Sequence, residues 1–183
     1  IPGAERWIIG SAYHEHVGTA YTRVFDVHPF AETPHHRGIL LSRPEAWRWY
    51  ASQDRPVYLI EAHPAVPTSR AYPRAAIGER FGARAAQAIS SSIDQMMPLA
   101  LMEYFDEIHL CGVRMNSVEE WVTQRECLGY WIGVAEGLGV RVVTDPLAAL
   151  CTPEVVYGWG EVTGAVRAPG TPIVVYGRPG AVA

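Results

Sequence analysis

Short apolar runs alternate along the chain with longer stretches in which apolar residues recur at three- and four-residue steps. The short runs are rich in β-branched and aromatic residues and are bounded by turn-forming residues, a pattern typical of strands. We expect six such strands. They span residues 6–10, 23–28, 56–62, 106–112, 140–144 and 172–177.

The longer stretches predict three helices. One covers residues 42–54, where Ser42 precedes Glu45 by three positions, the spacing of a capping box. A second covers residues 117–139 and opens with the same Ser-x-x-Glu spacing. The third is the apolar run 93–104, which three serines precede. Strands that alternate with helices predict an α/β fold.

The expected fold is a single Rossmann-like α/β domain over residues 1–183, with a mostly parallel sheet and helices on both faces. Residues 160–183 contain the last strand, for which three arrangements stay open. It is an appended strand, an edge strand in a hairpin with residues 154–162, or an integral parallel strand. In the last case the fold is circularly permuted, and this strand takes the position of its first strand.

The amino-acid composition excludes some reaction mechanisms and disfavours some partners. All 15 basic residues are arginine, so mechanisms that need a lysine, such as a Schiff base or a P-loop, are excluded. A formal net charge of −4 disfavours extended nucleic-acid binding, although a local arginine patch keeps DNA open as a partner. The 49% hydrophobic content is enough for a full core.

Three cysteines at wide spacing, without a Cys-x-x-Cys pair, indicate reduced thiols and a cytoplasmic protein. No apolar stretch reaches the roughly 20 residues that span a bilayer, and the sequence starts without an export signal, so no membrane association is expected. Four histidines, His14, His16, His35 and His36, lack the carboxylate or cysteine spacing of a metal site. We therefore predict no metal.

Two histidines follow strands directly and are the candidate catalytic residues. His28 ends "VFDVHPF" and His63 ends "YLIEAHPAVP". Ligands of open α/β sheets bind at the carboxyl ends of the strands, so both imidazoles are expected at one crevice, as candidate general bases. A histidine before a proline also ends a strand for structural reasons alone, and the two interpretations are equally weighted.

Three serines, Ser90, Ser91 and Ser92, precede the apolar run 93–104. One of them is expected to cap the helix, which is the more common role of such serines. The free N–H groups of the first turn offer a second role, the binding of a phosphate. Pro98 lies inside the run and is expected to kink or break the helix.

Two stretches carry a family resemblance: "SSSIDQMMPLALMEYFDEIHLCGVRM" and "EEWVTQRECLGYWIGVAEGLGVRVVTDPLAALC". They resemble a set of phage and prophage proteins of uncharacterised function. More distantly, they resemble the nucleotide-binding half of small bacterial sialyltransferases and the pterin pyrophosphokinase-like family. The likeness covers residues 85–158, with a weaker echo in "VFDVHP". It implies a Rossmann-like nucleotide-binding domain, in the host cytoplasm if the protein is phage-encoded.

The resemblance also implies binding residues. Ser91 and Ser92 match a serine turn that approaches the nucleotide phosphate and ribose, and Gly112 matches the glycine after the next strand. Arg114 departs from the relatives, which carry an acidic residue there, and either binds phosphate or abolishes the original chemistry. The glycine-rich phosphate loop of the relatives is missing after the first strand.

The C-terminal "GRPG", with Gly177 and Gly180, looks like this missing loop. Together these observations predict a nucleotide- or nucleotide-sugar-binding protein that transfers a group to a hydroxyl acceptor in the manner of a glycosyltransferase. His28 or His63 is the expected base, and Arg114 and Arg125 neutralise the leaving phosphate. The alternative is a non-catalytic nucleotide- or protein-binding phage accessory module. The acceptor, DNA or glycan, and a homo-oligomeric state stay open.

Overall fold

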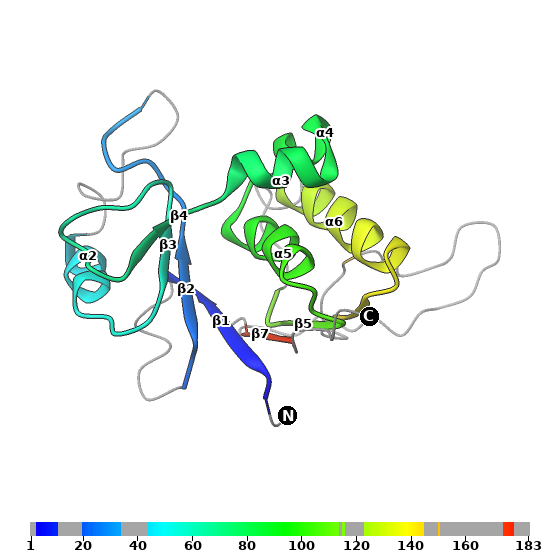
Figure 1. Cartoon of the computed structure of the whole chain (residues 1–183), viewed down its shortest axis with the longest axis horizontal. Coiled ribbons are helices and arrows are strands. Elements are labelled where there is room, and N and C mark those ends of the chain that lie inside the picture. The colour runs from blue at the N-terminus through cyan, green and yellow to red at the C-terminus, as the bar shows by residue number, and fades with distance from the viewer. Residues whose placement is uncertain are drawn as a thin grey trace.

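The structure is a computed structural model of the whole chain. It describes residues 3–10, 20–33, 44–113, 115, 123–144 and 150, together with the backbone of residues 174–177. Figure 1 shows a sheet that runs through the middle of the molecule, with one helix on one side and a group of helices on the other.

Within the described residues, seven strands form one sheet in the order β4-β3-β2-β1-β7-β5-β6. The strands are β1 (Glu5–Ile9), β2 (Arg23–Asp26), β3 (Val57–Leu59), β4 (Ser69–Ala71), β5 (Glu107–Cys111), β6 (Arg141–Thr144) and β7 (Val174–Gly177). Strands β1 to β4 pair in parallel, and β5 pairs in parallel with β6. The predicted mostly parallel sheet of a Rossmann-like α/β fold is therefore confirmed.

The C-terminal strand β7 lies in the centre of the sheet. It pairs antiparallel with β1 on one side, where Trp7 lies opposite Val175, and with β5 on the other, where Leu110 lies opposite Val175. The appended strand and the edge hairpin are therefore wrong, because both edges of β7 are already paired. The integral strand next to β1 is confirmed in position, but its predicted parallel direction is wrong.

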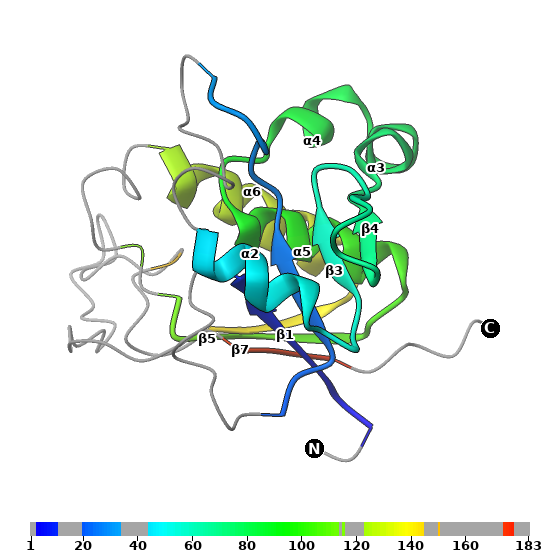
Figure 2. The same cartoon turned by 90° about the vertical axis from the view of Figure 1, so that its left-hand side faces the viewer.

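The helices cover both faces of the sheet, as expected. Helix α2 (Pro44–Ala51) lies on one face, and α3 (Arg74–Phe81), α4 (Ala83–Gln87), α5 (Ser92–Met102) and α6 (Arg125–Gly137) lie on the other. Figure 2 shows α2 in front of the strands and α5 and α6 behind them. The core is correspondingly split in two, a small cluster under α2 and a large one under α5 and α6.

Helix α5 is the most deeply buried of the described helices. Every residue from Ser92 to Leu101 is at most 9% exposed. The helix continues through Pro98, so of the two predicted effects of this proline, a kink or a break, the break is wrong. At its C-terminal end, Arg23 of β2 contacts Glu103 at 2.6 Å and Glu5 of β1 at 2.7 Å, which joins the helix to two strands.

The sequence pattern did not predict three of the described elements. Strand β4 has three residues, none of them buried, and is held by its ladder to β3. Helices α3 and α4 are short and separated at Gly82, so no apolar period extends far enough to predict them. The helices expected over residues 42–54 and 117–139 are present as α2 and α6, while Ser42 and residues 117–122 lie outside the described residues.

The central position of β7 makes a prediction about folding. Removing residues 170–183 should abolish cooperative unfolding, because it leaves facing backbone groups of β1 and β5 unpaired in the middle of the sheet. Val175→Pro should also destabilise the fold, because proline has no backbone N–H to donate within the sheet. Val175→Ile keeps this N–H and should be tolerated. Thermal melts followed by circular dichroism measure both; an unchanged melting temperature of the truncated chain would contradict a central β7.

Candidate functional site at the carboxyl edge of the sheet

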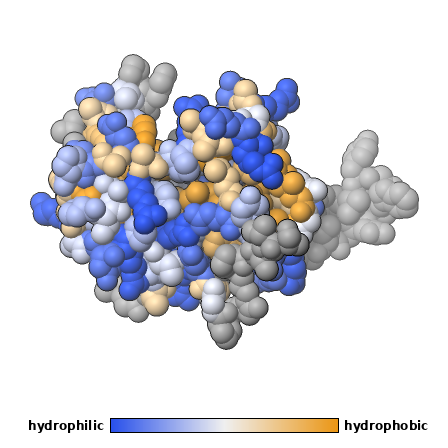
Figure 3. Space-filling model, in the orientation of Figure 1, coloured by the Kyte–Doolittle hydropathy of each residue, from blue (hydrophilic) through white to orange (hydrophobic). Residues whose placement is uncertain are grey.

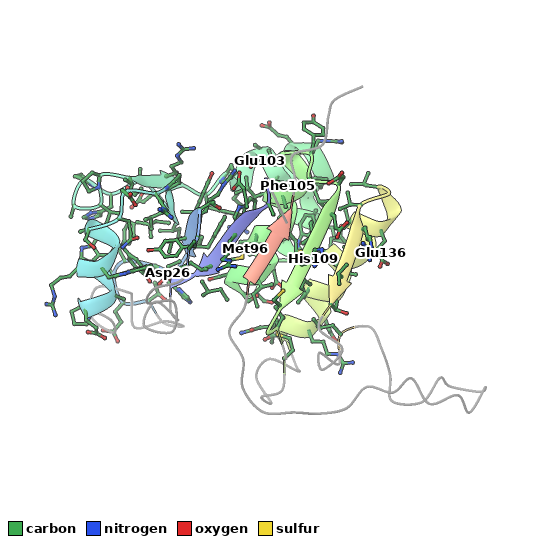
Figure 4. The ribbon with its side chains drawn as sticks, turned by 90° about the horizontal axis from the view of Figure 1, so that it is seen from below. Asp26, Met96, Glu103, Phe105, His109 and Glu136 are labelled. Atoms are coloured by element: carbon green, nitrogen blue, oxygen red, sulfur yellow. The ribbon has the colours of Figure 1, made fainter. Side chains whose placement is uncertain are left out.

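The carboxyl ends of the parallel strands meet at one edge of the sheet. Strand β2 ends there at Asp26, β3 at Leu59 and β5 at Cys111. Because α5 leads into the start of β5, its own first turn, at Ser91, lies at the same edge. In Figure 4, Asp26 marks this edge and Glu103 the opposite one. The expectation that His28, His63, Ser91 and Gly112 share one edge therefore agrees with the topology.

A carboxylate–imidazole pair forms the centre of the site. The Oδ1 atom of Asp26 contacts Nδ1 of His28, two residues further along the chain. Asp26 is completely buried, while 30% of the His28 side chain is exposed. The buried carboxylate thus holds one ring nitrogen and directs the other, Nε2, away from itself. This is the arrangement in which a carboxylate orients a histidine for proton transfer.

Tyr50 contacts the second oxygen of the Asp26 carboxylate. Its hydroxyl on α2 donates a hydrogen bond to Oδ2 of Asp26, so each carboxylate oxygen has a partner. The phenol ring lies directly over Gly10, at the end of β1, where a Cβ atom would be 2.8 Å from Cε1 of Tyr50. A side chain at position 10 would therefore displace the tyrosine from Asp26.

His63 lies at the same edge but in different surroundings. Its Nδ1 accepts a hydrogen bond from the N–H of Ala65 at 3.2 Å, which stabilises the turn after β3. Its ring packs perpendicular to Phe30 and to Trp47, with centroids 5.1 and 4.8 Å away. His63 thus has a carboxylate partner in none of its described contacts, whereas His28 contacts Asp26.

The serine turn caps α5. Ser91 is the N-cap, and its hydroxyl accepts the N–H of Asp94 at 3.3 Å, as the capping interpretation predicts. Asp94 in turn accepts both the backbone N–H and the hydroxyl of Ser90 on Oδ2, at 3.0 and 2.8 Å. Ser92 follows as a buried residue of the first turn. The negative charge at this helix start is therefore supplied by the chain itself.

Asp94 is an unusual carboxyl group. It is completely buried, and its Oδ1 has no hydrogen-bond partner among the described residues. Burial raises its pKa to about 6, although the hydrogen bonds from Ser90 and Ser91 lower it in part. A neighbouring phosphate would oppose ionisation further, since like charges repel.

The remaining predicted residues fall into three groups. Gly112 follows β5 with a φ of 72°, a backbone conformation that favours glycine, and Arg125 opens α6 at the same edge. Gly177 pairs with Glu5 at the beginning of β1, so its predicted place at the crevice is wrong: the antiparallel direction of β7 carries it to the opposite edge. Arg114 and Gly180 lie outside the described residues.

Sequence reasoning missed Asp26, Tyr50 and Asp94. The Asp-x-His spacing at the end of a strand was a usable signal for Asp26, because residues i and i+2 of an extended chain point to the same side. Asp94 stands three residues after Ser91, a position from which a carboxylate reaches back over the helix start. Tyr50 offered no local signal.

Two further observations concern metal ligands and helix length in the described residues. No three His, Cys, Asp or Glu side chains of the described residues are grouped as a metal ion requires. The four histidines considered for metal binding lie outside those residues. None of the helices in the described part of the chain is long and apolar enough to cross a bilayer.

The raised pKa of Asp94 predicts a pH-dependent stability. Its pKa is 3.8 in the unfolded chain and about 6 in the fold, so the folded state binds the proton more tightly. Stability from this group is therefore complete below pH 4 and lost as the pH rises through 6. Asp94→Asn should remove this loss, about 3 kcal/mol at about 1.4 kcal/mol per pKa unit.

Urea denaturation of wild type and Asp94→Asn between pH 4 and 7 measures the difference. Asp54, whose side chain is 85% exposed, provides the control variant Asp54→Asn, which should follow the wild type. A constant gap between the wild-type and Asp94→Asn curves would show that Asp94 does not titrate in this range.

Comparison with known protein families, with curated proteins and with solved structures finds no match to this chain. We therefore base its function on the side chains at the carboxyl edge.

Proposed function

We propose that this protein binds a nucleotide or nucleotide sugar at the carboxyl edge of its sheet and transfers the sugar to a hydroxyl acceptor, with His28 as general base. The observation that carries the proposal is the pair formed by buried Asp26 and partly exposed His28. A paired carboxylate supports the imidazolium that forms when His28 takes up a proton. The pair also stands at the edge where α/β sheets bind their ligands.

The reaction assigned to this pair is a displacement at the anomeric carbon of the sugar. The acceptor oxygen forms the new bond to that carbon, and the bond to the phosphate oxygen breaks with its electron pair leaving on the nucleotide. The acceptor proton passes to Nε2 of His28 while Asp26 holds Nδ1. Tyr50 keeps Asp26 in place and is a positioning residue.

The leaving phosphate needs positive charge or N–H groups. The start of α5 is a poor place for it, because the Asp94 carboxyl already accepts the donors of Ser90. The turn at Gly112 and the start of α6 at Arg125 suit it better, since a guanidinium forms strong charge-assisted bonds to phosphate. We accordingly place the phosphate near Gly112 and Arg125 and leave the serine turn as a cap.

One observation favours the second candidate, a non-catalytic nucleotide- or protein-binding module. An ionised Asp94 at the helix start repels a phosphate from the serine turn that the sialyltransferase resemblance implies as its binding place. A protein that has this fold but does not catalyse the group transfer would bind its ligand at the same edge without turnover.

A thermal-shift screen with CMP, UMP, UDP, GDP and the sugar nucleotides CMP-sialic acid, UDP-glucose and GDP-mannose tests the binding step. A ligand at one hundred times its dissociation constant should add about 2.7 kcal/mol to the stability. Binding by none of these probes would contradict the transferase and the nucleotide-binding module, and would leave the protein-binding module as the remaining candidate.

For a sugar nucleotide that binds, the transfer reaction is followed by the free nucleotide that it produces. His28→Ala should lower the rate of this reaction about 10²- to 10⁴-fold, since a general base acts in the transition state. The thermal shift that the sugar nucleotide causes should stay unchanged, because binding does not need the base. The matched control is His109→Ala. His109 on β5 also contacts a carboxylate two residues away, Glu107, but it lies in the middle of a strand and not at the carboxyl edge. Binding without any release by the wild type would support the module, and equal rates in both variants would exclude His28 as the base.

A further inference from the structure

Two of the three exposed large apolar side chains in the described part of the chain lie at the amino edge of the sheet. They are Tyr104, 57% exposed, and Leu138, 53% exposed. Tyr104 follows α5 and Leu138 follows α6, and the strands that come next, β5 and β6, pair with each other. The N–H of Arg141 donates to the carbonyl of Asp106 at 2.9 Å. The two apolar side chains therefore belong to neighbouring turns.

The turn after α6 has the usual residue at its left-handed position. The N–H of Gly139 donates to the carbonyl of Glu136 at 3.0 Å, and the N–H of Val140 donates to that of Ala135 at 2.9 Å. This pair of bonds is the Schellman motif, in which the residue with a positive φ is most often glycine. Gly139 fits this rule with a φ of 81°.

The turn after α5 has the same motif with a tyrosine in the glycine position. The N–H of Tyr104 donates to the carbonyl of Leu101, and the N–H of Phe105 donates to that of Ala100. The φ of Tyr104 is 60°, which strains a residue with a bulky side chain. Its exposed ring gains little packing in return. Neither the backbone nor the core explains this tyrosine, and strained residues of this kind cluster at functional and binding sites.

Carboxylates lie in or next to both turns. They are Glu103, Asp106, Glu107 and Glu136, and Figure 4 labels Glu103 beside the first turn and Glu136 beside the second. Arg23 pairs with Glu103, and Arg141 pairs with Glu107. Asp106 and Glu136 are exposed, and neither has an ion pair within the described ranges. We call Tyr104, Leu138, Asp106 and Glu136 the turn patch.

The chain presents a surface of complementary charge on β4, α3 and α4. Glu79 is the one carboxylate of these three elements. The Nε atom of Arg74 donates to the carbonyl of Ala86 at 3.3 Å, which connects α3 to α4. Figure 3 shows hydrophilic residues over these two helices, in the upper part of the view. Four arginines of the three elements are exposed, and we call them the arginine patch: Arg70, Arg74, Arg80 and Arg84.

We propose that the turn patch binds the arginine patch of a second copy of this chain. The inference does not rest on the proposed function. A guanidinium forms strong hydrogen bonds to carboxylates and stacks on the face of a tyrosine ring, so the carboxylates and the ring of the turn patch both find partners there. Two turn patches placed face to face would bring like charges together, so the turn patch does not bind itself.

Sedimentation velocity of the full chain tests the contact. The weight-average sedimentation coefficient of the wild type should rise with concentration up to about 1 mM. The rise should shrink in about 1 M sodium chloride, where the screening length is about 3 Å. Leu138→Ser should weaken association about tenfold, because it removes an apolar side chain from the contact. The matched control is Ile60→Ser, which changes the exposed apolar side chain at the carboxyl edge and should leave association unchanged.

Tyr104→Gly separates the contact from the stability of the single chain. In dilute solution this variant should melt about 2–4 °C above the wild type, because glycine adopts the left-handed φ without strain. At high concentration it should associate about tenfold more weakly than the wild type. A lower melting temperature would show that the single chain needs the ring, and would overturn the inference.

Charge reversal identifies the partner surface. Glu136→Arg and Arg84→Glu should each weaken association about tenfold or more, since each places like charges across the contact. An equimolar mixture of these two variants should associate again, because each keeps the patch that the other has lost. The matched control is Glu61→Arg, at an exposed carboxylate of the carboxyl edge, which should associate like the wild type. Circular dichroism checks the fold of every variant.

Three results would overturn the proposal. The first is a wild-type sedimentation coefficient that does not rise with concentration. The second is association that both Tyr104→Gly and Leu138→Ser leave intact. The third is a mixture of Glu136→Arg and Arg84→Glu that does not associate, or an Arg84→Glu variant that associates like the wild type, because the turn patch would then bind another surface of the chain.

Discussion

The burial of α5 on every side is the constraint on which the rest of the structure depends. Its residues from Ser92 to Leu101 pack between the sheet and the helices α3 and α6. A helix without a solvent face cannot leave its first N–H groups to water, so its ends need partners from the protein. At the start, the hydroxyl of Ser91 accepts the N–H of Asp94, and the carboxyl group of Asp94 accepts the N–H of Ser90, which precedes the helix. At the other end, Arg23 holds Glu103 and lies over the ring of Trp7 at 4.6 Å.

This constraint explains why two buried carboxyl groups at the same edge differ in chemistry. Asp26 is hydrogen-bonded on both oxygens, by Tyr50 and His28. Asp94 has its partners on one oxygen only, because the packing around α5 brings no described donor to the other. Burial without a cation raises its pKa, whereas Asp26 can serve to orient an imidazole. The edge therefore contains one carboxylate that contacts an imidazole and a phenol, and one that lies at the start of a helix.

The central strand β7 has a separate consequence for the site. Reversing one strand between β1 and β5 keeps the sheet continuous, but it sends the end of that strand to the amino edge. Gly177 therefore lies opposite Glu5 at the start of β1, away from the carboxyl edge.

The sequence by itself determined the α/β class, six of the described strands, the serine cap of α5 and the place of His28 after β2, because these follow from local periodicity and turn chemistry. It did not determine the direction of β7, whose apolar run "IVVY" reads alike in both directions. Nor did it indicate that Tyr50 reaches Asp26 or that Phe30, Trp47 and His63 meet. Those contacts join residues that are from 16 to 33 positions apart and belong to separate elements, and the packing of α2 against the sheet brings them together.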